Sequence, residues 1–179
     1  MNLILTVLLG VLSLIVLLLI IAAFVKKEYS VERDIIISKP KGNVFDYLKR
    51  LKNQDNFSKW ALMDPNMKKE YRGTDGTAGF VSAWDSNDKN VGKGEQEIKR
   101  ITEGDRIDYE IRFIKPFAGV ANAYLKTTSV SNNRTMVAWG FESKMKYPMN
   151  LMLLFMNMEK MVGKDFETGL LNLKNLLER

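Results

Sequence analysis

The feature that most constrains the fold is a series of six short segments with strand character between residues 66 and 143. In residues 106–113, apolar side chains occupy the odd positions and charged side chains the even ones, which is the period-two pattern of a half-buried strand. Turn residues at 103–105 and 131–133 separate neighbouring segments and suit hairpin connections. The expected strands are residues 67–72, 79–85, 92–101, 106–113, 120–130 and 135–143.

The flanking segments predict one further strand and the helices. Residues 29–38 contain three consecutive isoleucines and indicate a strand, and Pro40 fits the first turn of a short helix that continues to about Leu51. An irregular or helical piece follows at residues 53–63. Residues 149–178 are helical in pattern, with one apolar stripe formed by Phe166, Leu170, Leu173 and Leu177.

These elements predict an α+β domain in which a seven-stranded antiparallel sheet curves around a long C-terminal helix. The helix covers only one side of the concave face, so we expect a cavity between sheet and helix. Glycine costs about 1 kcal/mol relative to alanine inside a helix. Gly163 and Gly169 therefore either mark a close approach of the last helix to the sheet or are ordinary imperfections in it.

The N-terminal residues form a separate unit. From Leu3 to Val25 the chain carries no charge, and a helix over this stretch is roughly 34 Å long, enough to cross a hydrocarbon core of about 30 Å. The alternative is a cleaved signal peptide, which would need a basic n-region, a shorter apolar core and an Ala-x-Ala-like site. We expect a transmembrane anchor at residues 1–27 and one folded domain at residues 28–179.

The distribution of charge bears on orientation and partners. Lys26 and Lys27 follow the apolar run and no Lys or Arg precedes it, so the positive-inside rule predicts a single-pass membrane protein whose domain faces the cytoplasm. The net charge of +6 lies entirely after Val25 and favours anionic lipid headgroups. Charges of both signs are interspersed and no nucleic-acid motif is present, so we expect no nucleic-acid partner. No protein partner is indicated.

Cysteine and histidine are both absent, which excludes disulfides, Cys or His metal sites, and nucleophiles activated by histidine. We expect neither a metal nor a cofactor. Carboxylates remain as acid–base candidates, and four lie on expected strands: Glu95, Glu97, Glu110 and Glu142. Solvent-facing positions are the favoured interpretation for each of them.

Several short stretches resemble, in their order along the chain, the SRPBCC superfamily of START-like proteins, which includes polyketide cyclase/dehydrase and lipid-transport proteins. The resembling stretches are residues 31–37, 40–45, 57–60 with 64–65, 91–98, 113–116 and 135–139, and most distinctively 147–150 followed by 161–174. Together they extend over about residues 28–178. The chain is also similar to a bacterial subgroup in which a transmembrane helix precedes the domain. The resemblance implies the helix-grip fold.

The resemblance implies a pocket for a hydrophobic ligand but no shared catalytic residue, because the superfamily spans aromatase/cyclases, lipid carriers and stress proteins with no known reaction. Three functions stay open. The first is a membrane-tethered module that holds a hydrophobic small molecule or lipid without covalent chemistry, and the lack of His and Cys favours it. The others are a polyketide cyclase/dehydratase-like enzyme that uses a cavity carboxylate and a tyrosine, and a non-catalytic interaction or stress-response scaffold.

Large side chains are candidates to line the cavity, with ordinary core packing as the alternative for each. They are Trp60, Tyr71, Trp84, Tyr109, Phe113, Tyr124, Trp139, Phe141, Met152 and Phe155. The last two belong to a methionine-rich stretch, residues 149–161, which is either a gate over the cavity mouth close to the bilayer or a buried start to the last helix.

Overall fold

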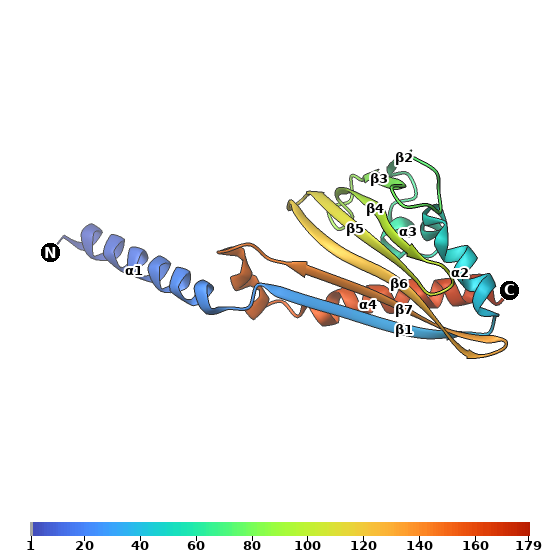
Figure 1. Ribbon diagram of the computed structural model, residues 1–179. Helices are drawn as coiled ribbons and strands as arrows, with labels where there is room; N and C mark the ends of the chain where they lie inside the picture. Colours follow the sequence, from blue (N-terminus) through green and yellow to red (C-terminus); the bar gives the residue numbers. More distant parts are fainter. Residues whose placement is uncertain (1) are drawn as a thin grey trace.

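The computed structural model describes residues 2–179 and contains one seven-stranded antiparallel sheet (Figure 1). Its strands are β1 (Glu28–Ile37), β2 (Lys68–Arg72), β3 (Val81–Asp85), β4 (Lys93–Thr102), β5 (Arg106–Lys115), β6 (Gly119–Ser131) and β7 (Arg134–Lys144). Their order in the sheet is β1-β7-β6-β5-β4-β3-β2, so the first strand pairs with the last and β2 forms the opposite edge. The seven expected strands are confirmed.

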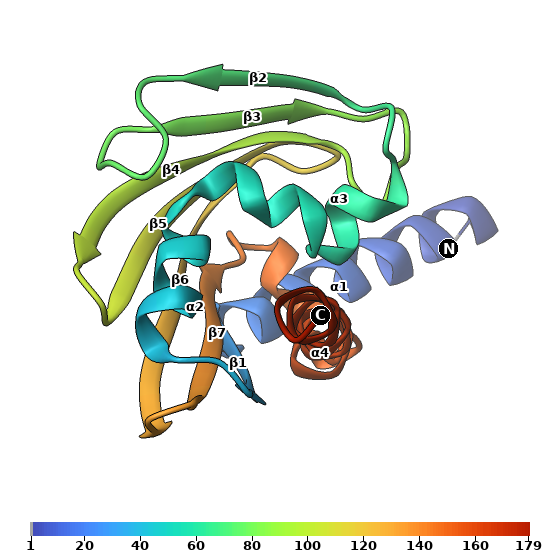
Figure 2. The ribbon, with the colours of Figure 1, turned by 90° about the vertical axis from the view of Figure 1, so that its right-hand side faces the viewer.

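The sheet curves around the helices of the domain, which lie on its concave side (Figure 2). The helical elements are α1 (Leu3–Phe24), α2 (Lys41–Lys49), η1 (Leu51–Asn56), α3 (Lys59–Met63), η2 (Met149–Leu154) and α4 (Met158–Leu177). Elements α2, η1 and α3 connect the two edges of the sheet, and α4 lies along β1. The curved sheet and this long helix confirm the predicted architecture.

The apolar stripe of α4 faces the sheet as predicted, with Phe166, Leu170 and Leu173 buried. The helix is shorter than expected at its N-terminal end. Asn157 accepts a hydrogen bond from the backbone N–H of Lys160 and caps α4, so residues 149–154 form the separate 3₁₀ helix η2. The expectation of one continuous helical segment from residue 149 was therefore wrong.

Both glycines of α4 mark close approaches to the sheet. A Cβ atom on Gly169 would lie 2.8 Å from Cζ3 of Trp139 on β7. One on Gly163 would lie 2.3 Å from Nη2 of Arg33 on β1. The Arg33 guanidinium also forms ion pairs with Glu159 and Glu167, both at 2.6 Å, on either side of Gly163 along the helix.

Helix α1 projects from the end of the sheet where η2 lies (Figure 1). It is long and apolar enough to cross a membrane. Its last turn contacts η2: the Asn150 side-chain amide donates to the carbonyl oxygens of Ala22 at 2.7 Å and Val25 at 3.0 Å. Ala22 and Asn150 are both fully buried, so α1 joins the domain through a packed contact.

Candidate functional site

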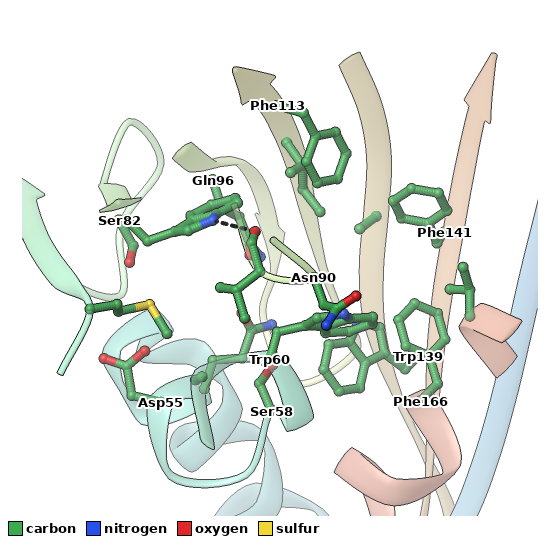
Figure 3. Close-up of a pocket in the computed structure, with 18 of the residues that line it drawn as sticks. Asp55, Ser58, Trp60, Ser82, Asn90, Gln96, Phe113, Trp139, Phe141 and Phe166 are labelled. Carbon is green, nitrogen blue, oxygen red and sulfur yellow. Dashed lines mark hydrogen bonds between the residues drawn. The ribbon is translucent and has the colours of Figure 1, made fainter. Parts of the chain in front are cut away.

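A cavity of about 310 Å³ lies between the concave face of the sheet and helices α3 and α4 (Figure 3). This volume is at the lower end of the range for pockets that hold drug-sized ligands. The lining is mainly apolar, and its large side chains include Tyr29, Trp60, Trp84, Phe113, Trp139, Phe141 and Phe166.

Aromatic side chains from several elements form one wall of this cavity. Trp139 of β7 stacks on Phe166 of α4 with ring centroids 4.6 Å apart, and Trp60 of α3 contacts both rings edge-on at 6.4 and 5.9 Å. Along the strands, Phe141 continues this cluster and lies 6.5 Å from Phe113. The period-two alternation of β5 and β7 directs these side chains to the concave face.

Polar groups gather on another side of the cavity, near η1, β2 and β3 (Figure 3). Asp55 pairs with the Lys69 ammonium at 2.7 Å and accepts a hydrogen bond from the Tyr71 hydroxyl at 2.6 Å. Burial, and next the Asp55 carboxylate, raise the pKa of Tyr71 well above its usual value, so the phenol stays protonated. Within residues 2–179, the buried Nε2 of Gln54 has no hydrogen-bond partner. Ser58, Ser82, Asn90 and Gln96 complete the polar lining.

This arrangement suits an amphiphile. An apolar body can contact the aromatic wall, and hydrogen-bonding groups on one side can orient a polar end. Trp84 contributes to the apolar wall, and its Nε1 donates a hydrogen bond to the Val91 carbonyl at 3.2 Å. This bond fixes the indole and satisfies its one hydrogen-bond donor.

The structure brings together five of the ten side chains expected to line the cavity, namely Trp60, Trp84, Phe113, Trp139 and Phe141. Tyr71 lies just outside the lining, where it stacks on Phe80 and holds Asp55. Tyr109 lies deeper, in the hydrophobic core, and its burial raises the pKa of its hydroxyl.

The remaining three lie elsewhere. Tyr124 is on the convex face, over Gly140, with the Arg106 guanidinium 3.7 Å from its ring centroid. Burial and a hydrogen bond to Glu32 raise the pKa of Tyr124 to about 12. Met152 lies in η2 and Phe155 directly follows it, and both are outside this cavity.

The polar lining residues were not found from the sequence. Gln54, Asp55 and Ser58 lie in the connection at residues 53–63, which the sequence marks only as an irregular or helical piece around Phe57 and Trp60. The usable signal was composition, because these polar residues flank two large aromatics within a short segment. Lys69 on edge strand β2 gave no comparable signal.

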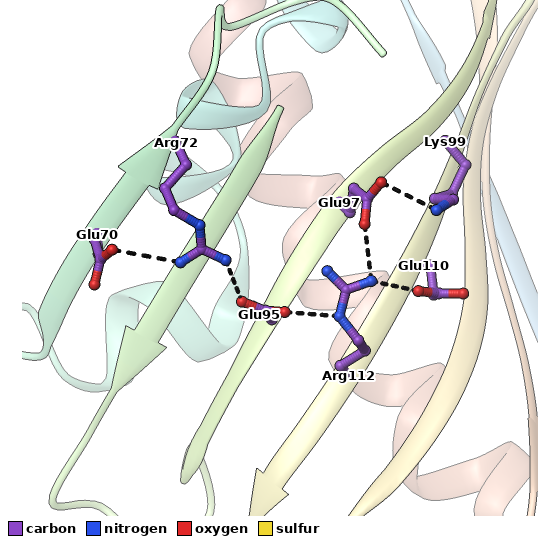
Figure 4. A network of polar contacts seen from close by, with 7 residues as sticks. All are labelled: Glu70, Arg72, Glu95, Glu97, Lys99, Glu110 and Arg112. Carbon is purple, nitrogen blue, oxygen red and sulfur yellow. Dashed lines mark hydrogen bonds and ion pairs between the residues drawn. The ribbon is translucent and has the colours of Figure 1, made fainter. Parts of the chain in front are cut away.

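Carboxylates on the strands face away from the cavity and form an ion-pair network on the convex face (Figure 4). Arg112 binds Glu95 at 2.7 Å and Glu97 at 2.8 Å, and it also pairs with Glu110. Hydrogen bonds from Arg72 and then Arg112 lower the pKa of Glu95, and those from Lys99 and then Arg112 lower the pKa of Glu97. The predicted solvent-facing placement of these glutamates is confirmed.

Among residues 2–179, no group of three or more Asp or Glu side chains is arranged to hold a metal ion. The acidic side chain of the cavity lining is Asp55, and both of its oxygens already have protein partners.

A second, open groove adjoins the cavity at the end of the domain nearest α1. It runs between the β5–β6 loop and η2, and five methionines line it: Met145, Met149, Met152, Met156 and Met158. Tyr29, Phe113 and Met158 line both the groove and the cavity. These three side chains therefore form the boundary between the two spaces.

No family model and no curated protein matches the sequence, whereas many solved structures share its fold. The Zhui aromatase/cyclase from Streptomyces sp. R1128 is 15% identical, with a TM-score of 0.60 over 85% of this chain and 94% of that one. A truncated norcoclaurine synthase from Thalictrum flavum is 8% identical, with a TM-score of 0.63 over 86% and 95%. Protein CV1439 from Chromobacterium violaceum is 13% identical, with a TM-score of 0.58 over 84% and 97%. The chain therefore has the helix-grip fold of the SRPBCC proteins, the fold that its sequence resemblance implied.

Proposed function

We propose that the protein is a membrane-tethered binding module that holds a hydrophobic small molecule or a lipid in its internal cavity. The observation that carries the proposal is the open space of about 310 Å³, which persists although three tryptophans and three phenylalanines border it. A scaffold with a vestigial pocket would have filled that space with these side chains, because protein interiors pack to near-crystalline density.

The lining narrows the class of ligand. Its aromatic wall favours a flat or extended apolar body, and the polar side around Asp55 and Gln54 favours one polar end. The similarity to an aromatase/cyclase and to norcoclaurine synthase supports a small organic ligand. A single-chain amphiphile or a polycyclic molecule fits both considerations.

Attachment to a membrane through α1 is part of the proposal. The length and composition of α1 and its packed contact with η2 support a retained anchor. Lys26 and Lys27 directly after it support a domain that faces the cytoplasm.

The chain offers an intrinsic reporter for ligand binding, since its three tryptophans, Trp60, Trp84 and Trp139, all line the cavity. We expect cis-parinaric acid, a fluorescent fatty acid, to quench their emission by energy transfer when added to the full-length protein in detergent micelles. Replacing Ala61, a cavity-lining residue of α3, with phenylalanine narrows the cavity and should weaken this quenching. Ala83→Phe, on β3 outside the lining, is the matched control. Equal quenching in all three proteins would contradict the proposal.

A cyclase-type enzyme is the second candidate, and the Asp55–Tyr71 pair favours it. A carboxylate at the cavity with a protonated phenol 2.6 Å away could pass a proton to or from a bound polyketide-like molecule. The test is liquid chromatography with mass spectrometry of a bound poly-β-ketone over time, because cyclisation changes the retention time at constant mass and dehydration removes one water. Turnover in the wild type that Asp55→Asn abolishes without loss of binding would establish the enzyme. A ligand unchanged in both retention time and mass would exclude this reaction for that ligand.

A further inference from the structure

The position of η2 is tied to that of α1 by hydrogen bonds. Besides the contacts from Asn150 to Ala22 and Val25, the Tyr147 hydroxyl donates to the carbonyl oxygen of Leu19 at 3.3 Å. Leu19 and Val25 are separated by roughly 9 Å along a helix axis. If α1 spans the bilayer and ends at the headgroups, η2 lies at the level of the boundary between headgroups and acyl chains.

The side chains that η2 and its flanks expose are those expected at such a boundary. Phe155 is 86% exposed and Leu154 is 56% exposed, and Met149 at the start of η2 is also exposed. Apolar side chains gathered in one exposed patch mark an interaction surface. Lys26 and Lys27 follow α1, and Lys146 precedes η2. All three are exposed and none forms an ion pair within residues 2–179, so they are available to anionic headgroups.

The methionine-lined groove leads from this surface to the cavity. Methionine side chains are flexible and adapt to varied apolar shapes. The boundary between groove and cavity consists of side chains, Tyr29, Phe113 and Met158, so rotamer changes alone are enough to join the two spaces.

We propose that η2, with Leu154 and Phe155, is embedded in the headgroup layer, and that the methionine-lined groove is the passage by which a single-chain amphiphile moves between the bilayer and the cavity. The inference rests on the proposed binding function and adds the source of the ligand and its route. A bilayer is the occupant because η2 packs against the membrane end of α1 and because Lys26, Lys27 and Lys146, which flank this contact, form no ion pair within residues 2–179.

The membrane contact can be tested independently of any ligand. The chain contains no cysteine, so single cysteines can be placed and labelled without background. Full-length Phe155→Cys, carrying a bimane fluorophore, is reconstituted in vesicles of phosphatidylcholine and phosphatidylglycerol that contain doxyl-labelled lipid. Glu28→Cys, at the start of β1, controls for proximity to α1, and Val130→Cys, exposed near the β6–β7 turn, is the distant control.

We expect strong quenching at position 155, weaker quenching at position 28 and none at position 130. Quenching at position 155 no greater than at position 28 would overturn the membrane contact. In that case we would expect a protein partner, and not the bilayer, to cover Phe155 in the cell.

The route is tested by the rate of loading. Vesicles that contain cis-parinaric acid are mixed with protein-containing vesicles, and energy transfer from the cavity tryptophans is followed over time. Phe155→Asp should slow loading by about tenfold, because a carboxylate at the boundary between headgroups and acyl chains is partly desolvated and is repelled by anionic headgroups. The matched variant Val130→Asp should load at the wild-type rate.

The outcomes separate the two proposals. Equal final quenching with slower loading in Phe155→Asp supports the passage. Equal rates in both variants, with normal final quenching, overturn the passage and leave the binding function standing. A wild-type protein that shows no quenching in vesicles or in micelles overturns the binding function and the passage together, whatever the depth of position 155.

Discussion

At the scale of single residues, glycines, which have no side chain, decide how closely α4 approaches the sheet. Gly169 lets the helix approach the Trp139 ring closely, and that indole stacks on Phe166 at 4.6 Å to form the aromatic wall of the cavity. The carbonyl oxygen of Phe57 closes the other side, 3.5 Å from where a Cβ would be. The wall is therefore set jointly by one glycine and two aromatic rings.

Gly169→Ala should destabilise the protein even though alanine favours helix. Overpacking a core costs about 1–3 kcal/mol, and the gain in helix propensity offsets about 1 kcal/mol of that. We expect the free energy of unfolding to fall by about 1 kcal/mol, measured by urea titration of tryptophan fluorescence in micelles. Thr168→Ala, the neighbouring position on the same helix, should leave the free energy of unfolding nearly unchanged. A stabilised Gly169→Ala protein would show that the helix can move away from Trp139.

Residue parity explains which cavity residues the sequence could predict. Phe113, Trp139 and Phe141 follow the period-two pattern of long strands, so their common face follows from the alternation alone. Tyr109 has the same parity, but its position along β5 places it in the core, and no local pattern encodes that depth. Asp55 and Gln54 belong to the connection between the sheet edges, whose path depends on the completed tertiary structure.

At the scale of elements, strands β2, β4 and β5 carry the charged network of the convex face. Ion pairs lower the pKa of Glu95 and Glu97 below 4.5 in the folded state. Each glutamate therefore stabilises the fold at pH values above about 4.5, and that contribution is lost as the pH falls through the lowered folded-state pKa.

We expect the double variant Glu95→Gln/Glu97→Gln to melt at a lower temperature than the wild type at pH 7, and the two melting temperatures to converge as the pH falls below about 4.5. The effect is modest because these pairs are partly solvent-exposed. Glu142→Gln, on β7 outside the network, controls for the removal of a carboxylate. A constant difference in melting temperature at every pH would show that packing, and not charge, is responsible.

Asn150 donates two of the three side-chain hydrogen bonds that tie η2 and its flank to α1, and Tyr147 donates the third. Replacing Asn150 with alanine removes the donor to Ala22 and Val25, and each unpaired buried carbonyl costs about 1 kcal/mol or more. We expect trypsin to cleave the full-length protein after Lys26 or Lys27 about tenfold faster, because 1.4 kcal/mol corresponds to a factor of ten in the opened population.

Gel analysis of the protein in lipid nanodiscs measures this cleavage rate. Asn172→Ala removes a comparable amide, which donates to Phe57 within the domain, and should not alter cleavage at the junction. Equal rates in the wild type and Asn150→Ala would mean that the junction is already open.

Strands were easier to predict than the segment at residues 149–158. Hairpin turns and alternation specify each strand locally, whereas η2 has the composition of a helix start and departs from α4 because Asn157 caps α4 and Asn150 is held by α1. The second of these contacts joins residues 128 positions apart, so it is invisible to any local pattern.

At the scale of the whole molecule, the architecture follows from the order of the elements. Structures only 8–15% identical to this chain share it, so the fold depends on alternation, turns and one amphipathic helix and tolerates nearly any particular side chain. Ligand identity depends on the few polar groups of the cavity and is for that reason not predictable from the fold.

The orientation of the protein is testable with two single-cysteine variants of the cysteine-free chain. Asn132→Cys places an exposed thiol on the β6–β7 turn, and Asn2→Cys places one before α1. If α1 is a retained anchor with a cytoplasmic domain, a membrane-impermeant maleimide added to intact cells should label position 2 and reach position 132 only after lysis. The reverse pattern would invert the topology, in which case the domain would meet lipids of the outer face. Loss of the cysteine at position 2 from a protein that keeps position 132 would identify α1 as a cleaved signal, and η2, whose Asn150 is held by Ala22 and Val25, would then lose its partner.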